Sequence, residues 1–301
     1  MTIVTIAQII LVMLLWATCF PLITAGIEFA PHLTFAALRA ILAGLTLTAL
    51  ALALRRPLPK EGRVWAMVAI IGLGATSLGF LGMFHAAEFV SPGIATVIAN
   101  TQPLLAAGLA GIILNDRLTA HGKAGMALGF VGILVIDSPQ LFSDGQNNYL
   151  IGVAYILMAA LGITVSNVLI KRLAGNVDAL MAMGLQMLIG SIPLVLGAWA
   201  MEEPTAVQWS FTFVGALLVL SLFGTALVYW LWFSVLEKVP LNRANAFSFL
   251  IPIFGLTMGV QFYGEPLGWP QLIGIALTIL GVALVTRHGT MSGEVGHDAP
   301  R

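Results

Sequence analysis

Small polar residues share one helical face within a hydrophobic stretch of the chain. Thr96, Asn100 and Pro103 are spaced at i, i+4 and i+7, which places them on one side of a helix. In a lipid-embedded helix, amides and hydroxyls need other polar groups or a polar solute as partners. A proline in a helix interior also leaves a backbone carbonyl without its hydrogen bond. The spacing predicts either a binding site for a polar group or hydrogen bonding between helices.

A later stretch repeats this pattern. Asn245, Phe249 and Pro252 have the same spacing, and Ser248 lies beside them. We expect the polar and aromatic residues of both stretches to line a binding cavity and both prolines to act as hinges or gates. The alternative for the polar residues is interhelical hydrogen bonding, which contributes about 0.6 kcal/mol per bond in membranes.

Aromatic residues form a second candidate set. Phe80 and Phe84 are four residues apart and share a helix face, and Tyr229 and Phe233 have the same spacing 149 residues later. Further candidates for the cavity lie beside these residues or in the first and sixth hydrophobic stretches: Trp16, Phe20, His85, Ser166, Asn167 and Trp230. Aromatic stripes are also typical of helix packing and of membrane-interface belts, so the spacing leaves both interpretations open.

These residue types predict solute binding rather than catalysis. The sequence has no His-Glu-x-x-His motif and no paired aspartates at membrane depth, so an intramembrane enzyme is disfavoured. The single cysteine, Cys19, excludes a multi-cysteine metal site, and we expect neither a metal nor a cofactor. Aromatic walls with neutral amides suit an apolar or aromatic solute with a small polar head. Sugar phosphates would require several lysines or arginines.

Arg39 is the one formal charge inside a hydrophobic stretch, and two interpretations are open. The arginine could extend along its helix to the outer membrane interface near Glu28. It could instead be an interior cation that fixes helix ends or meets a substrate carboxylate. We favour a structural role for Arg39.

The elements that position these residues are membrane helices. Of the 301 residues, 59% are hydrophobic and only 9% are charged, against about 25% charged residues in soluble domains. Uncharged runs long enough for membrane helices follow one another along the whole chain. We predict an all-α membrane protein with ten transmembrane helices: Ile3–Ile27, Leu33–Leu54, Val64–Ala86, Pro92–Leu114, Gly122–Ile136, Tyr149–Ile170, Ala179–Ala200, Phe211–Leu236, Ala244–Tyr263 and Trp269–Thr286.

Charge predicts the orientation of these helices. With ten spans, twelve of the 13 lysines and arginines fall on the side that carries both termini, and none falls on the other side. Cytoplasmic loops retain basic residues, so both termini are expected in the cytoplasm. No cleavage pattern follows the first span, which we interpret as a retained helix and not a signal peptide. The formal net charge of zero argues against a nucleic-acid partner.

The two halves of the chain repeat one unit. A shift of 149 places Leu73–Thr76 on Leu222–Thr225 and Pro103 on Pro252, and a shift of 147 places Arg39 on Gln186. We predict five-helix repeats over residues 1–140 and 149–288, the second inverted, followed by a polar tail over 289–301. Glycines spaced three and four apart on the fifth helix, and small residues on the tenth, predict that these two helices pack together and join the halves.

The chain resembles the EamA family of the drug/metabolite transporter superfamily. The resemblance covers about residues 6–286 and is carried by the duplication together with short motifs, which are Leu14–Ala17, Ala36–Arg39, Asn100–Pro103, Asp116–Leu118 and Gly264–Leu267. Within the family, the chain looks most similar to the YddG-type exporters of aromatic amino acids. The resemblance implies export of small metabolites, foremost aromatic or hydrophobic amino acids, by alternating access through a cavity between the repeats.

The resemblance also implies a multi-pass location in the bacterial inner membrane. Expected partners are membrane lipid and a small-molecule substrate, and the protein is expected to function as a monomer with internal pseudo-symmetry. The alternatives are an exporter of drugs or other neutral metabolites, and a non-transporting membrane scaffold. All acidic residues fall in loops or at span edges, which favours a facilitative carrier over a proton-coupled one.

Overall fold

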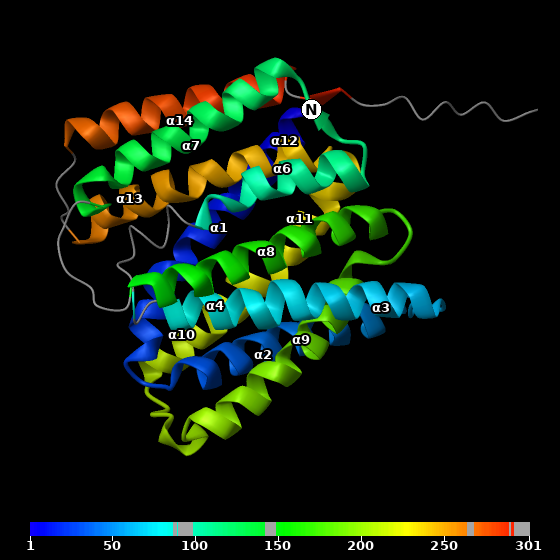
Figure 1. The fold of residues 1–301 in the computed structure, drawn as a ribbon. Helices are drawn as coiled ribbons and strands as arrows, with labels where there is room; N and C mark the ends of the chain where they lie inside the picture. The colour runs from blue at the N-terminus through cyan, green and yellow to red at the C-terminus, as the bar shows by residue number, and fades with distance from the viewer. Residues whose placement is uncertain (87–88, 90–98, 142–148, 264–267, 289, 292–301) are drawn as a thin grey trace, which may run out of the picture.

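The computed structural model describes residues 1–86, 89, 99–141, 149–263, 268–288 and 290–291. These residues form a helical bundle, with one small two-stranded ladder in which Arg117 pairs with Met291 and Leu118 with Thr290. The elements in chain order are α1 (Ile3–Ile27), α2 (His32–Ala53), α3 (Gly62–Ile71), η1 (Gly72–Leu78), α4 (Gly79–Ala86), α6 (Gln102–Ile113), β1 (Arg117–Leu118), α7 (Ala120–Leu141), α8 (Tyr149–Leu173), α9 (Ala179–Met201), η2 (Pro204–Ala206), α10 (Phe211–Ser221), η3 (Leu222–Leu227), α11 (Val228–Lys238), α12 (Leu241–Ala246), η4 (Phe247–Phe249), α13 (Leu250–Tyr263), α14 (Trp269–His288) and β2 (Thr290–Met291). The helices lie side by side, with α7 and α14 along one edge and α2 and α9 along the other (Figure 1).

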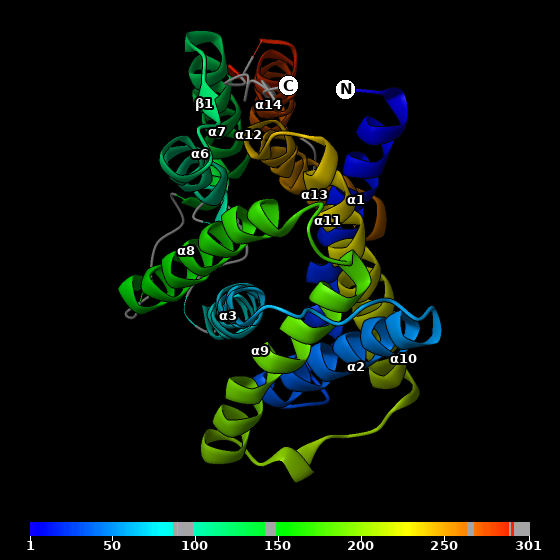
Figure 2. The same cartoon turned by 90° about the vertical axis from the view of Figure 1, so that its right-hand side faces the viewer.

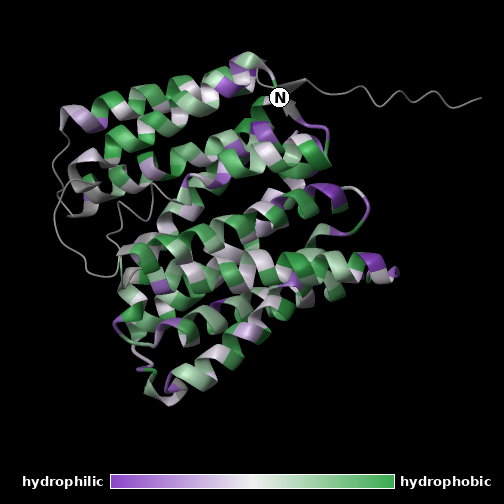
Figure 3. Cartoon of the chain, viewed as in Figure 1, coloured by the Kyte–Doolittle hydropathy of each residue, from purple (hydrophilic) through white to green (hydrophobic). Residues whose placement is uncertain are grey.

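Seven helical segments of the described chain are long and apolar enough to cross a membrane. They are Ile3–Ile27, His32–Ala53, Gly62–Ala86, Leu150–Leu173, Ala179–Met201, Phe211–Lys238 and Trp269–Arg287. Large apolar side chains lie exposed along the bundle, among them Ile112 and Leu196, and hydrophilic residues gather near the helix ends (Figure 3). An apolar outer surface of this kind is suited to lipid. The three remaining predicted spans correspond to the short apolar segments Gln102–Ile113 and Ala120–Ile136 and to the interrupted run α12–η4–α13, and residues 92–98 of the first lie outside the described residues. The count of ten therefore stays a prediction.

Two of those remaining spans were expected to be continuous helices with an interior proline, and the structure corrects this. Asn100 and Thr101 form a turn before α6, so Pro103 lies in the first turn of that helix. The short 3₁₀ segment η4 separates α12 from α13, and Pro252 lies in the first turn of α13. Proline is well tolerated in a first turn because the N–H groups there have no helical partner. Both prolines therefore follow a helix break.

Two π-helical segments, η1 and η3, occupy matching positions in the two halves. They interrupt the runs α3–α4 and α10–α11, and they carry the repeated Leu73–Thr76 and Leu222–Thr225 sequences. A π segment widens the backbone and turns some carbonyl groups away from their usual helical partners. The duplication seen in the sequence thus extends to an unusual backbone feature.

Helices α7 and α14 pack together along their small residues, as predicted (Figure 2). A Cβ atom at Gly281 would lie 2.5 Å from the backbone nitrogen of Gly129 and 2.6 Å from the carbonyl oxygen of Gly125. A Cβ atom at Gly132 would lie 2.8 Å from the carbonyl oxygen of Gly274. Only glycine permits backbones to approach this closely, so these residues hold the first half against the second.

Both ends of the described chain lie at the same end of the bundle. Met1 and Arg287 line one pocket, which also includes Ile6 and Thr286. The β1–β2 ladder places the segment after α14 beside the connection between α6 and α7. The chain thus returns to the end of the bundle at which it begins.

Candidate functional site

A cavity of about 160 Å³ lies inside the bundle between the two halves. Its walls come from α1, α2, η1, α4, α6, α8, α11, α12, η4 and α13, together with the turn that precedes α6. The lining residues are Trp16, Cys19, Ile23, Arg39, Ala75, Gly79, Phe80, Met83, Ala99, Asn100, Gln102, Pro103, Ile163, Asn167, Tyr229, Trp232, Asn245, Ser248 and Ile251. An apolar cavity of roughly 150 Å³ holds one benzene ring.

The internal duplication extends to this cavity. Four pairs of lining residues are 149 positions apart: Phe80 and Tyr229, Met83 and Trp232, Ala99 and Ser248, Gln102 and Ile251. Equivalent positions of the two repeats therefore face the same space. Inverted-repeat transporters bind their substrates at this place, between the repeats.

Aromatic rings form one wall. Trp16 lies between the two main hydrophobic clusters of the core and contacts both. Its ring is 6.2 Å from that of Tyr229 in an edge-to-face arrangement and 5.4 Å from that of Trp232. The Trp232 indole donates a 2.9 Å hydrogen bond to Asn167 Oδ1, which holds the ring in place. Such a wall suits an aromatic or apolar group.

Arg39 also lines the cavity, and the structure corrects the interpretation that its side chain extends to the outer interface. The side chain is only 2% exposed, about seven residues or 10 Å along α2 from its start. Its Nε donates to Thr225 Oγ1 at 2.7 Å, and its Nη2 donates to the Gly224 carbonyl at 3.4 Å. The guanidinium carbon lies 4.5 Å from the centre of the Phe80 ring. The cavity is thus cationic, and not neutral as its aromatic and amide residues alone predicted.

Polar side chains from the helix breaks complete the cavity. Asn100 precedes α6, Asn245 lies in α12, and Ser248 lies in η4. Asn245 is 1% exposed, and neither its Oδ1 nor its Nδ2 has a hydrogen-bond partner among the described residues. In transporters, interrupted helices of this kind supply polar groups to a solute. The chemistry available here is recognition by one cation, several amides and aromatic rings.

The structure brings eight of the predicted residues to the cavity, and they are Trp16, Phe80, Pro103, Asn100, Asn167, Tyr229, Asn245 and Ser248. Several others are core residues instead. Phe84 packs against Phe35 at 5.9 Å between ring centres, and Phe233 is fully buried in the main core cluster. Phe249 packs where a side chain on Gly129 would otherwise lie.

Three more predicted residues also lie away from the cavity lining. Ser166 Oγ donates to the carbonyls of Gly162 and Ile71 and so joins α8 to α3. His85 packs against Tyr155, 5.3 Å away between ring centres. Pro252 is buried in α13 but does not line the cavity. Thr96 and the Phe20 side chain lie outside the described residues.

On α11, the tryptophan that lines the cavity beside Trp16 is Trp232 and not the predicted Trp230. Trp230 is 37% exposed on the outer surface of the bundle, whereas Trp232 is 1% exposed. Trp232 lies three residues after Tyr229 and so shares its helix face, while Trp230 is the next residue and points elsewhere. The i, i+3 spacing from Tyr229 could have identified Trp232 from the sequence. Met83, Gln102 and Cys19 are the other chemically informative lining residues that were not predicted for the cavity. Arg39, for which a contact with a substrate carboxylate was one of the open interpretations, also lines it.

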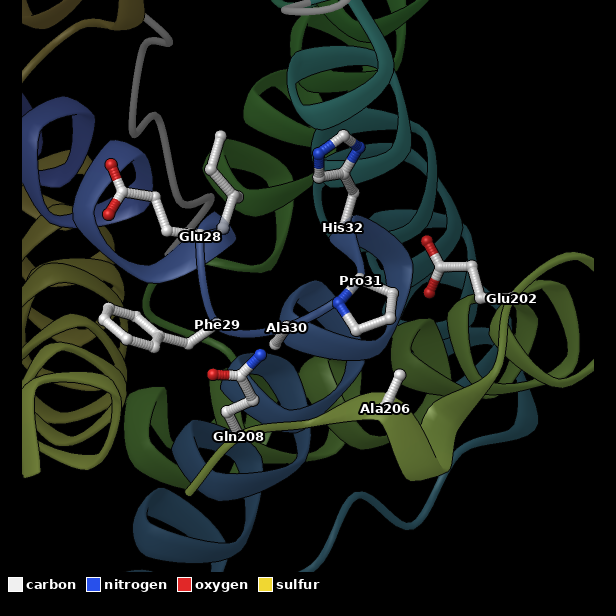
Figure 4. Close-up of a pocket in the computed structure, with 9 residues that line it drawn as sticks. Glu28, Phe29, Ala30, Pro31, His32, Glu202, Ala206 and Gln208 are labelled. Carbon is white, nitrogen blue, oxygen red and sulfur yellow. The ribbon is translucent and has the colours of Figure 1, made fainter. Parts of the chain in front are cut away.

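A second hollow, of about 370 Å³, lies at the ends of α1, α2 and α9 (Figure 4). Two acidic residues, Glu28 and Glu202, line it, and Glu202 is hydrogen-bonded to the start of α2. The Glu202 carboxylate accepts hydrogen bonds from the Leu33 and Thr34 backbone N–H groups at 2.7 and 2.8 Å and from the Thr34 hydroxyl at 2.9 Å. These contacts cap the start of α2, so we assign Glu202 a structural role.

Comparison with known proteins agrees with the internal duplication. A sequence profile described as the EamA-like transporter family matches residues 3–137 and, a second time, residues 150–287. A solved crystal structure superimposes with a TM-score of 0.82 at 20% identity, over 94% of this chain and 98% of that one, which shows a shared fold.

Three individual relatives share 26–31% sequence identity with the chain. The chain is 31% identical to a WAT1-related chloroplastic protein of Arabidopsis thaliana, over 90% of this chain and 66% of that one. It is 26% identical to the uncharacterized transporter YvbV of Bacillus subtilis, over 90% and 88%. It is 28% identical to a probable amino-acid metabolite efflux pump of Salmonella typhimurium, over 91% of each protein.

Proposed function

The chain belongs to the EamA-like transporter family of multi-pass membrane proteins, and from this premise we propose that it exports small metabolites, foremost aromatic or hydrophobic amino acids. The solute would bind in the cavity between the repeats and leave by alternating access. The observation that carries this proposal is the cavity itself, whose volume and aromatic wall suit one ring. The relative named as an amino-acid metabolite efflux pump adds support.

The pseudo-symmetry of the cavity supports the alternating-access mechanism. Each repeat contributes a π segment and a broken helix. The two broken helices and η1 border the central space, and η3 hydrogen-bonds to the lining residue Arg39. Repeats inverted relative to each other provide two equivalent gates, one for each side of the membrane. In this proposal Pro103 and Pro252 mark the start of the two helices that move at those gates.

The proposed orientation places both termini in the cytoplasm of a bacterial cell, with the protein in the inner membrane. The ten predicted spans place twelve of the 13 lysines and arginines on the side that carries both termini, which supports this orientation. Ten crossings would account for the return of the chain to that end. The protein would act as a monomer, with the second repeat in the place of a partner.

Counterflow in proteoliposomes tests the proposed function. Vesicles holding the full chain and loaded with one unlabelled amino acid would take up labelled phenylalanine transiently. Trp16→Ala removes part of the aromatic wall and should reduce the initial rate at least about tenfold. Trp199→Ala is the matched control, because Trp199 is 78% exposed at the end of α9. Failure of the wild type to exchange any aromatic or aliphatic amino acid would refute the proposal.

A further inference from the structure

Two equivalent contacts join a helix of one repeat to the π segment of the other, and they use different residues. At one contact between the repeats, Arg39 of α2 donates to Thr225 of η3. At the equivalent contact, Thr76 of η1 donates to Gln186 Oε1 at 2.9 Å, and Gln186 of α9 occupies the position equivalent to Arg39. A neutral amide is therefore sufficient to join the helix of one repeat to the π segment of the other. This contact therefore does not require the positive charge of Arg39.

The difference between Arg39 and Gln186 coincides with the position of the cavity. Arg39 lines the cavity, whereas Gln186 is fully buried and does not appear among its lining residues. The Arg39 guanidinium also has one nitrogen, Nη1, without a hydrogen-bond partner in the described part of the chain. Nη1 is covered in this state, so a solute reaches it after a small rotation of the guanidinium or a widening of the cavity.

The described lining residues leave the charge of Arg39 uncompensated. They include one arginine and no aspartate or glutamate. The ring of Phe80 and the carbonyl of Gly224 stabilise the cation but carry no formal negative charge. A buried, unpaired cation at membrane depth is strongly unfavourable, and such residues normally pair with an anion.

Neighbouring amides add hydrogen-bond donors to the same space. Gln102 Nε2 and Asn245 Nδ2 are buried without partners among the described residues, and both side chains line the cavity. A carboxylate accepts several hydrogen bonds and pairs with a guanidinium in a fixed geometry. A phosphate carries more charge than the single cation of this cavity can balance.

We propose that Arg39 binds the carboxylate of the transported solute while the solute's apolar group lies against Trp16, Tyr229 and Trp232. The carboxylate is then the required group, and the amino group of an amino acid is dispensable. Aromatic monocarboxylates without an amino group bind as well as phenylalanine or better, because they leave the cavity electrically neutral. This inference rests on the proposed function, in which the cavity carries the solute.

Competition experiments test the contributions of the carboxylate and the amino group of phenylalanine one at a time. Exchange of labelled phenylalanine is measured at neutral pH with excess 3-phenylpropionate, which has only the carboxylate, or with phenethylamine, which has only the amine. Thermal unfolding of the purified protein is followed with the same two compounds as a direct measure of binding. We expect 3-phenylpropionate to inhibit exchange and raise the unfolding temperature, and phenethylamine to do neither.

Variants at position 39 then test the residue. Arg39→Gln places the residue of the second repeat in the first and should weaken 3-phenylpropionate binding about 30-fold or more, with loss of discrimination against phenethylamine. Arg39→Lys keeps the charge and should retain the discrimination with weaker binding. Arg172→Gln removes an exposed arginine at the end of α8 and should behave as the wild type.

The outcomes distinguish this inference from the proposed function. If phenylalanine is exchanged but phenethylamine competes as well as 3-phenylpropionate, or if Arg39→Gln keeps the discrimination, the carboxylate site is refuted while transport stands. If no aromatic or aliphatic amino acid is exchanged but 3-phenylpropionate stabilises the wild type and not Arg39→Gln, amino-acid transport is refuted while the carboxylate site stands. If 3-phenylpropionate neither competes nor stabilises the wild type, the carboxylate site is refuted.

Discussion

At the scale of single residues, Asn245 has a buried amide without hydrogen-bond partners among the described residues, and it lines the cavity. An unsatisfied buried amide costs about 1–3 kcal/mol. We interpret the Asn245 amide as a hydrogen-bonding group that remains available for a solute.

Substitution of Asn245 by leucine should therefore separate stability from transport. Asn245→Leu removes the unsatisfied amide and should leave the free energy of unfolding unchanged or about 1 kcal/mol higher. Phenylalanine exchange should nevertheless decrease at least about tenfold. Asn242→Leu in the same helix is the control. Asn242 Nδ2 donates to the Asp116 carbonyl, so this change should cost about 1 kcal/mol and leave exchange intact.

Thermal unfolding in detergent and exchange in vesicles measure the two effects. An Asn245→Leu protein that is as destabilised as Asn242→Leu yet transports normally would assign Asn245 to packing.

Substitution of Glu202, in contrast, is expected to change only the stability of the fold. Glu202→Ala removes three hydrogen bonds at the start of α2 and should lower the free energy of unfolding by about 1–2 kcal/mol. Glu203→Ala, at the exposed neighbouring residue, should change it by less than about 0.5 kcal/mol. Equal unfolding temperatures for the two variants would show that the cap contributes nothing to stability.

At the scale of the helices, the glycine contact between α7 and α14 brings the backbones of the two repeats close together. Gly281→Ala would push a methyl group against the Gly129 and Gly125 backbone and should cost about 1–3 kcal/mol. Gly215→Ala has no described atom within 4 Å of the added Cβ and should be neutral or up to about 1 kcal/mol stabilising. Thermal unfolding of both variants tests this, and an equally stable Gly281→Ala protein would contradict the close approach.

The same scale shows what the sequence could predict. The Gly and Thr spacing identified the α7–α14 contact because small residues are useful only where backbones meet. The helix break at η4 was not predicted, since the sequence does not distinguish a proline in a helix interior from one in a first turn. The family resemblance implied a turn at Asn100–Pro103, but the spacing of Pro103 was interpreted as that of a helix interior. The inward face of a helix was also ambiguous. Lipid and core are both apolar, so hydrophobicity alone did not separate Trp230 from Trp232.

Arg39 shows the limit of residue-by-residue interpretation. Its charge was visible in the sequence, but its partners Thr225 and Gly224 lie about 185 residues later in η3. Only the packing of the two repeats reveals that this arginine is buried beside the cavity. The repeat alignment, by contrast, correctly paired positions such as Phe80 and Tyr229, because equivalent positions of a duplicated unit face the same axis.

At the scale of the whole molecule, the absence of described acidic residues from the cavity predicts uncoupled transport. Phenylalanine is neutral overall, and the lining includes no carboxylate that could carry a proton in return. We expect labelled phenylalanine in proteoliposomes to equilibrate across the membrane without accumulation when a pH gradient is imposed. Accumulation that follows the imposed gradient would show proton coupling and contradict this account.

We propose that the transported solute occupies the cavity between the repeats. Cysteine protection tests it in a Cys19→Ser background that retains transport, with Ser248→Cys in the cavity wall and Arg172→Cys at an exposed position. At phenylalanine concentrations of about ten times the dissociation constant, modification of the cysteine at 248 by a methanethiosulfonate reagent should slow about tenfold, and modification at 172 should not change. Equal rates at 248 with and without phenylalanine, in a protein that exchanges phenylalanine, would contradict the claim.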